Sequence, residues 1–178
     1  MQNLNTYAKI SDKIDTLKQF VHTGVKIIFI GGKMVNPFLL AKKAKSENKT
    51  FDLDNIPTTL LSATKENNEI LVNDVGLAGE IFDLANDKGV SFIFPDDYKC
   101  VNDFKASTFF IKTKPDFNKE MQLDLGPKTI ESLRKIVLSG KIKNVFWNGP
   151  LGAYDHPTNQ NYAEGSLELA KILFSEAL

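Results

Sequence analysis

Several features that would place this chain in other protein classes are scarce or missing. Lys+Arg and Asp+Glu number 22 each, so no basic excess is available to attract a nucleic-acid backbone. The apolar run at residues 27–30 is far shorter than the roughly 20 residues that cross a bilayer. Residues 1–7 have neither the basic end nor the apolar stretch of a signal peptide. We therefore expect no nucleic-acid partner and no membrane association.

Cysteine is almost absent, and its scarcity points to a reducing compartment. The single cysteine, Cys100, cannot form an internal disulfide. A small buried hydrophobe is a more economical interpretation of Cys100 than a catalytic thiol. The chain is expected to be cytoplasmic.

Size and composition are those of an ordinary globular protein. A chain of 178 residues, 42% hydrophobic and 25% charged, can bury one sizeable core. We expect residues 1–178 to form a single domain.

Strand-like and helix-like patterns alternate along the chain, with glycine or proline at the boundaries. This alternation favours an α/β fold with a parallel sheet wrapped by helices. Residues 46–68, rich in Lys, Asn, Thr and Glu, are the expected excursion from this pattern. Helices are predicted from Ser11 to a stop at Gly24, after Gly31-Gly32, at 74–88, at 127–138 and at 162–178, and strands at 25–30, 90–94, 108–112 and 144–147.

The most informative segment is N-V-F-W-N-G-P-L-G at residues 144–152. Its first four residues suit the end of a buried strand, with Trp147 buried there. The Asn/Gly/Pro run that follows suits a loop with little side-chain bulk. A strand that enters such a loop before a helix is where parallel α/β sheets bind nucleotides. An ordinary strand–loop–helix corner is the plainer alternative.

This loop resembles the W-N-G-P-x-G-x-[FY]-E loop of phosphoglycerate kinases, in their C-terminal, nucleotide-binding domain. Five further motifs resemble that family in the same order, and only residues 46–72 fit poorly. They are A-K-I-S-D-K-I at 8–14, I-G-G-K-M at 30–34 with Phe38-Leu39, F-P-D-D-Y at 94–98, L-D-L-G-P at 123–127 and Y-A-E-G-S at 162–166.

The resemblance implies a three-layer, Rossmann-like parallel sheet with helices on both faces, incomplete at its C-terminal end. It implies ADP or ATP with Mg as the ligand, and it implies no catalytic residue and no metal ligand in this chain. The nucleotide-binding positions it carries over, as vestiges, are Ala8, Lys9, Lys13, Gly31, Gly32, Leu123, Asn148, Pro150, Gly152, Ala153 and Asp155.

Some of these residues also allow a plainer interpretation. Lys9 and Lys13, four residues apart at a helix start, suit a transferring phosphate, but two lysines alone are usually a solvated helix end. Asp155 stands where the family has a ribose-binding glutamate, one methylene longer, and it could instead cap the turn before Pro157.

Two other groups of residues are given no functional role. Asp96-Asp97 is better explained as a polar turn at a strand end than as a metal pair. His22 and His156 have no third ligand or nucleophile nearby in the sequence pattern.

Three family glycines are replaced by larger residues: Tyr7, Lys33 and Gln122. In the family these glycines keep the backbone bare against the nucleotide, so the substitutions are expected to obstruct it. Lys33 could add a phosphate contact, but obstruction is the stronger expectation.

Family segments that carry the rest of the chemistry do not occur in the sequence. They are the G-G-G-D-[ST] loop whose aspartate holds the metal, the phosphate-cradling S-T-G-G-G-A-S segment, and the N-terminal domain that binds 3-phosphoglycerate. Phosphoryl transfer depends on positioning donor, acceptor and metal together. We expect an inactive chain that binds adenine nucleotide weakly at best. The alternatives are one half of a split enzyme, completed by a complementary protein chain, and a non-catalytic partner-binding module.

Overall fold

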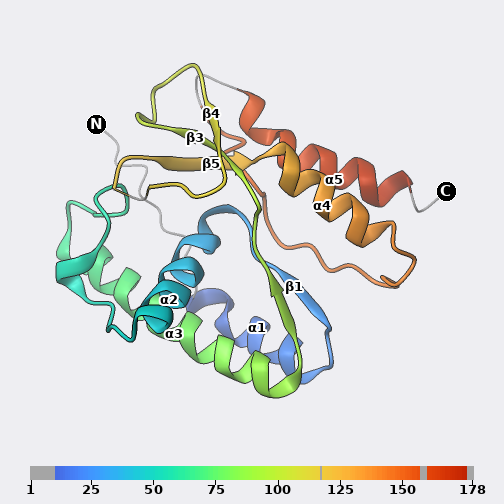
Figure 1. Ribbon diagram of the computed structural model, residues 1–178, viewed down its shortest axis with the longest axis horizontal. Helices are drawn as coiled ribbons and strands as arrows, with labels where there is room; N and C mark the ends of the chain where they lie inside the picture. Colours follow the sequence, from blue (N-terminus) through green and yellow to red (C-terminus); the bar gives the residue numbers. More distant parts are fainter. Residues whose placement is uncertain (1–10, 117, 157–159, 176–178) are drawn as a thin grey trace. The chain divides into compact units, whose positions relative to one another are not determined.

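The computed structural model describes residues 11–116, 118–156 and 160–175 (Figure 1). Contacts along the chain define two compact units, Met1–Phe94 and Pro95–Leu178. Each unit contains its own sheet and its own helices. The expectation of one domain over residues 1–178 stays a prediction.

The first unit is built around two parallel strands. β1 (Ile27–Phe29) pairs with β2 (Ser91–Ile93), with Ile28 opposite Phe92. Parallel neighbours require a long crossover, and here helices supply it. The crossover contains α2 (Val35–Glu47) and α3 (Lys65–Lys88), with short 3-10 turns η1 (Gly32–Met34) and η2 (Leu53–Asn55), while α1 (Ser11–His22) precedes β1. The predicted α/β class with a parallel sheet is confirmed, although the sheet is small and incomplete.

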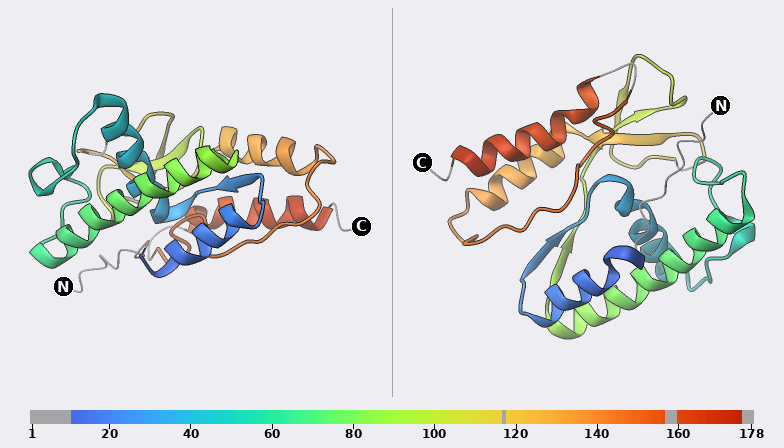
Figure 2. Two further views of the ribbon diagram at one scale, coloured as in Figure 1. Left: turned by 90° about the horizontal axis from the view of Figure 1, so that it is seen from below. Right: turned by 180° about the vertical axis from the view of Figure 1, so that it is seen from behind.

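The core of this unit is aromatic and lies between the helices and β2. Phe38 of α2 is fully buried. Its ring centroid lies 5.4 Å from those of Phe82 in α3 and Phe92 in β2, and 6.4 Å from that of Phe94. Figure 2 shows α1 and α2 beside α3, which is the longest helix. Clustered rings at these separations add specific packing to the area that they bury.

Helix α3 begins nine residues before the predicted start at Asp74. Thr64 caps the helix, because its side chain accepts a hydrogen bond from the Asn67 N–H at 3.4 Å. The first turn, residues 65–68, is entirely polar, so it carries no apolar periodicity that the sequence could reveal. The C-terminus was predicted correctly: Gly89 follows the helix with φ +65°, a left-handed conformation that suits glycine.

The second unit contains an antiparallel sheet that the sequence pattern did not predict. Its order is β4-β3-β5, so β4 is an edge strand. The strands are β3 (Tyr98–Val101), β4 (Phe110–Lys112) and β5 (Met121–Leu125), followed by α4 (Pro127–Val137), η3 (Gln160–Ala163) and α5 (Glu164–Ser175). β3 and β5 were missed because each buries a charged residue, Lys99 and Asp124, which interrupts the apolar pattern. Helices α4 and α5 lie side by side (Figures 1 and 2).

The predicted strand at residues 144–147 is wrong, and so is the predicted burial of Trp147. Residues 141–148 form no strand. The side chains of Val145, Phe146 and Trp147 are 50%, 67% and 40% exposed. β-branched and aromatic residues favour a strand only where a neighbouring strand and a covering layer are available. In the part of the chain that the structure describes, no strand of the second unit's sheet pairs with this segment.

Among the described residues, no helix is both long enough and apolar enough to cross a membrane.

Candidate functional site

The loop at residues 148–153 is held at the end of β5 and the start of α5. The Ala153 N–H donates to the Leu123 carbonyl at 2.7 Å, which fixes the loop against β5. The Leu151 N–H donates to the Ser166 hydroxyl at 2.9 Å, which fixes it against the first turn of α5. Leu151 itself is buried. Three sequence motifs therefore meet here, through one backbone–backbone hydrogen bond and one from a backbone N–H to a hydroxyl group.

The tip of the loop faces solvent. Asn148, Pro150 and Asp155 are exposed. The indole N–H of Trp147 donates to the Gly149 carbonyl at 2.6 Å, across a turn in which Gly149 has φ +99°. This left-handed conformation explains a glycine at that position. The exposed tip leaves its polar groups available to a ligand.

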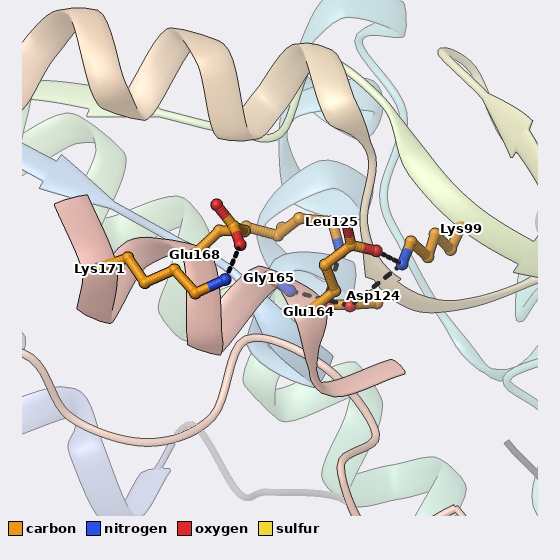
Figure 3. Close-up of polar contacts among 7 residues, drawn as sticks. All are labelled: Lys99, Asp124, Leu125, Glu164, Gly165, Glu168 and Lys171. Atoms are coloured by element: carbon orange, nitrogen blue, oxygen red, sulfur yellow. Dashed lines mark hydrogen bonds and ion pairs between the residues drawn. The ribbon is translucent and has the colours of Figure 1, made fainter. Parts of the chain in front are cut away.

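A buried carboxylate, that of Asp124, lies beneath the loop (Figure 3). Its Oδ2 accepts a hydrogen bond from the Gly165 N–H at 3.0 Å, at the start of α5. Its Oδ1 accepts from the Leu125 N–H at 2.9 Å. A carboxylate at a helix N-terminus satisfies a free backbone donor and interacts favourably with the helix dipole. Asp124 thus joins β5 to α5.

Two glycines allow the chain to approach this carboxylate closely. A Cβ added to Gly152 would lie 2.6 Å from Cγ of Asp124, and nearer still to the carbonyl oxygen of Tyr162. A Cβ added to Gly165 would lie 2.5 Å from Oδ1 of Asp124. Both positions therefore require glycine because of packing inside the protein. Gly152 was predicted as a nucleotide-facing residue, and this internal packing is a second reason for its identity.

The charge environment of Asp124 consists of one cation and a second carboxylate. Lys99 of β3 is buried, with Nζ 3.9 Å from Oδ2 of Asp124, and it also pairs with Glu164 of α5. The Lys99 ammonium lies 4.8 Å from the centroid of the Phe109 ring. Burial raises the pKa of the Asp124 carboxyl to about 6; the Gly165 and Leu125 N–H groups and Lys99 act in the opposite direction, and Glu164 raises it further.

Asp97 is a structural cap, as the interpretation of Asp96-Asp97 as a polar turn anticipates. The fully buried Asp97 carboxylate accepts hydrogen bonds from the N–H groups of Lys128 and Thr129, at 3.1 and 2.9 Å, in the first turn of α4. Gly126 is necessary here, because a Cβ would lie 2.5 Å from Oδ1 of Asp97. Pro127 occupies the first helical position, as predicted. Among the described residues, no three His, Cys, Asp or Glu side chains form a group that could hold a metal ion.

The remaining predicted site residues belong to the first unit. Gly31 is extended and Gly32 has φ +59°, so the chain turns sharply after β1 into η1. Lys33 is exposed in that turn. Lys13 lies in the first turn of α1 and is partly buried. The predicted residues Tyr7, Ala8 and Lys9 lie outside the described residues. The structure thus brings together Leu123, Gly152 and Ala153 with the exposed Asn148 and Pro150, while Gly31 and Gly32 lie in the other unit.

Comparison with known proteins decides the family. The family model described as phosphoglycerate kinase matches residues 7–177. This chain belongs to the phosphoglycerate kinase family. It is 33% identical over 167 residues to the phosphoglycerate kinase of Lactobacillus gasseri, and 32% identical over 169 residues to that of Plasmodium falciparum. Each match covers 93% of this chain, but only 34% and 35% of the relative, so the chain spans about a third of the length of these relatives.

Solved structures of phosphoglycerate kinases share the fold. The enzyme from Pyrococcus horikoshii OT3 gives a TM-score of 0.67 at 22% identity, covering 93% of this chain and 37% of that one. The enzyme from Coxiella burnetii gives 0.65 at 22% identity, covering 93% and 36%. These values support the same α/β architecture.

One departure from the family pattern can be located in the second unit. Gln122 of β5 has a side-chain amide whose nitrogen and oxygen are buried and make no hydrogen bond within the described residues. A buried amide without partners costs free energy, so a glycine at this position would remove the penalty as well as the bulk. Lys33, by contrast, is exposed, and whether it obstructs a ligand stays a prediction.

Two polar residues of the site were missed by reasoning from the sequence. Asp124 lies within the L-D-L-G-P motif, whose pattern predicts no role for its carboxylate, and no motif in the sequence includes Lys99. The sequence signal that could have indicated a close approach to Asp124 is the pair of glycines, Gly152 in the W-N-G-P-L-G motif and Gly165 in the Y-A-E-G-S motif. His156, to which no role was assigned, is buried against the rings of Phe104 and Tyr162, with centroids 4.4 and 4.9 Å away.

Proposed function

We propose that these 178 residues form a phosphoglycerate kinase-like module that keeps the scaffold of the nucleotide-facing loop but does not transfer phosphoryl groups by itself. The observation that carries the proposal is the docking of residues 151–153 onto β5 and α5 above the buried Asp124. That arrangement preserves the loop for which the family resemblance implies nucleotide contact. The proposal places the module in the cytoplasm, in keeping with its single buried thiol.

Adenine nucleotide binding is expected to be weak. Gln122 and Lys33 add atoms where the family has glycine, and a slot shaped for a flat base tolerates added atoms poorly. Asp155 is exposed, and exposed charged contacts are each worth about 1 kcal/mol or less. We expect a dissociation constant of about 1 mM or weaker, equivalent to roughly −4 kcal/mol.

Turnover by this polypeptide alone is not expected. The family's reaction needs the acceptor, the nucleotide and its Mg²⁺ held together. The family segments for the acceptor and the metal do not occur among these residues. No step is therefore assigned to any residue described above.

A second candidate function is binding to another protein chain. The chain would then be either one half of an enzyme that a complementary chain completes or a non-catalytic partner-binding module. The observation favouring it is the exposure of Val145 and Phe146, which are 50% and 67% exposed in a segment with strong strand propensity. Apolar residues gathered in this way often mark a contact with another polypeptide.

Calorimetric titration with MgADP and MgATP tests the proposal. The unmodified chain should show millimolar binding or none, and the double variant Lys33→Gly with Gln122→Gly should bind MgADP more tightly. Lys49→Gly, at an exposed lysine of the first unit, is the control for losing a positive charge. Circular dichroism verifies that each variant is folded. Micromolar binding by the unmodified chain, or an unchanged affinity in the double variant, would refute the obstruction argument.

A coupled assay for phosphoglycerate kinase turnover separates the two functions. The chain alone should not exceed a matched blank. Adding polypeptides that carry both the acceptor-binding domain and the metal- and phosphate-binding segments of a family member should leave the rate at zero under the first function and restore it under the second.

A further inference from the structure

The buried Asp124 carboxylate shares its cation with a second carboxylate. Asp124 from β5 and Glu164 from α5 both pair with Lys99 from β3, and the loop at residues 151–153 contributes backbone but no charge. Asp124 and Lys99 are both buried, while the Glu164 side chain is 53% exposed. Because the Lys99 ammonium is shared with the half-exposed Glu164, it only partly offsets the burial of the Asp124 carboxylate, and burial favours the neutral, protonated form of a carboxyl group.

Protonation of Asp124 would change the hydrogen bonds that join β5 to α5. Its two oxygens accept from two different backbone N–H groups, those of Leu125 and Gly165. Gly152 lies against the same carboxylate so closely that no Cβ would fit. A protonated carboxyl group retains one strong acceptor oxygen, so one of the two hydrogen bonds must weaken.

We propose that Asp124 is a proton-sensitive positioning residue, whose ionised carboxylate fixes the start of α5 against β5 beneath Gly152 of the loop, and whose protonation weakens its hydrogen bond from Gly165 or Leu125. The inference rests on the proposed function only where it concerns nucleotide binding. Its structural part concerns the free protein. Because the pKa of Asp124 is raised to about 6, mainly by burial, the change falls between pH 7 and pH 5.

Amide resonances measured by nuclear magnetic resonance on the full chain, without nucleotide, test the structural part. The Gly165 or Leu125 amide proton should follow a single titration with a midpoint near pH 6. Asp124→Asn should abolish it. Glu164→Gln should move the midpoint to lower pH, because it removes the negative charge that raises the Asp124 pKa.

Two control variants exclude other sources of the signal. Glu168→Gln removes a carboxylate one turn further along α5 that pairs with Lys171 (Figure 3) and also with Arg134, and it should leave the midpoint unchanged. His156→Gln removes a buried imidazole that packs against Tyr162 near this loop, and the Gly165 titration should survive it. If Asp124→Asn does not fold, Glu164→Gln still decides the matter.

Flat Gly165 and Leu125 resonances from pH 5 to 8, or an unchanged midpoint in Glu164→Gln, would overturn the inference. Calorimetry with MgADP at pH 7.5 and 5.5 is the second arm, and any binding should weaken at the lower pH. If MgADP binds with micromolar affinity while Gly165 still titrates, the proposed function fails and the inference stands. If no nucleotide binds at either pH, the Gly165 titration alone decides the inference. If nucleotide binds equally well at both pH values, the link from Asp124 to the loop is refuted.

Discussion

Replacing Gly152 with alanine is the most direct test of the junction between the loop, β5 and α5. The new Cβ would lie 2.6 Å from Cγ of Asp124, and closer to both Oδ1 and the Tyr162 carbonyl oxygen. Neither neighbour can move freely: one is backbone, and the other is a buried carboxylate bonded to the Gly165 N–H. The loop must therefore shift by about 1 Å, since carbon–oxygen contacts are normally above 3 Å.

The expected cost follows from that shift. Overpacking of a tight site costs about 1–3 kcal/mol. Loss of the hydrogen bond from Leu151 or Ala153 would add about 1 kcal/mol. Alanine also restricts the unfolded chain, which recovers roughly 0.4–1 kcal/mol. The net loss should be about 2–3 kcal/mol, and with a urea m-value of about 2 kcal/mol per molar the midpoint should fall by roughly 1 M.

Urea unfolding followed by the fluorescence of Trp147, the only tryptophan, reports on the second unit, which contains the substitution. Gly76→Ala is the matched control. Gly76 lies within α3, and a Cβ there would have no atom within 4 Å. This variant should be more stable by about 0.5–1 kcal/mol, because alanine is the better helix former. Its unfolding is followed by circular dichroism. If Gly152→Ala unfolds at the wild-type urea concentration with an unchanged m-value, the described packing against Asp124 is incorrect.

Two further predictions concern buried groups in the second unit. Asp97→Ala should destabilise that unit by about 3 kcal/mol, because a helix cap is lost and the N–H groups of Lys128 and Thr129 lose a buried acceptor. In the same urea assay, the substitution Asp96→Ala at an exposed position should change the free energy of unfolding by about 0.5 kcal/mol or less. Equal effects of the two substitutions would contradict the role of Asp97 as a helix cap. Cys100 is fully buried, and burial raises the pKa of its thiol to about 12, with a smaller contribution from Glu120 and an opposing one from Lys112. A disulfide reagent at pH 8 should therefore modify Cys100 only as fast as the protein opens, with a rate that rises steeply in urea. Immediate modification of the native chain would show that the thiol is accessible.

Local signals in the sequence determined much of this protein. Pro127 after Gly126 places the start of α4, and Gly89 places the end of α3, because proline and left-handed glycine act on the backbone at their own positions. The family could be inferred because its motifs are short runs in a fixed order, readable without knowledge of what they contact. The parallel α/β class also followed from local alternation of strand-like and helix-like segments.

Contacts between distant residues were decided only by the tertiary structure. Lys99 and Asp124 looked like interruptions of a strand pattern, and only the pairing of β3 with β5 shows that they are buried opposite each other, with Lys99 also pairing with the half-exposed Glu164. Trp147 looked buried because its segment has strand propensity, yet burial depends on a neighbouring strand that propensity cannot supply. The sequence gives the chemical type of each side chain, but its burial and its charged partners depend on how the folded chain packs.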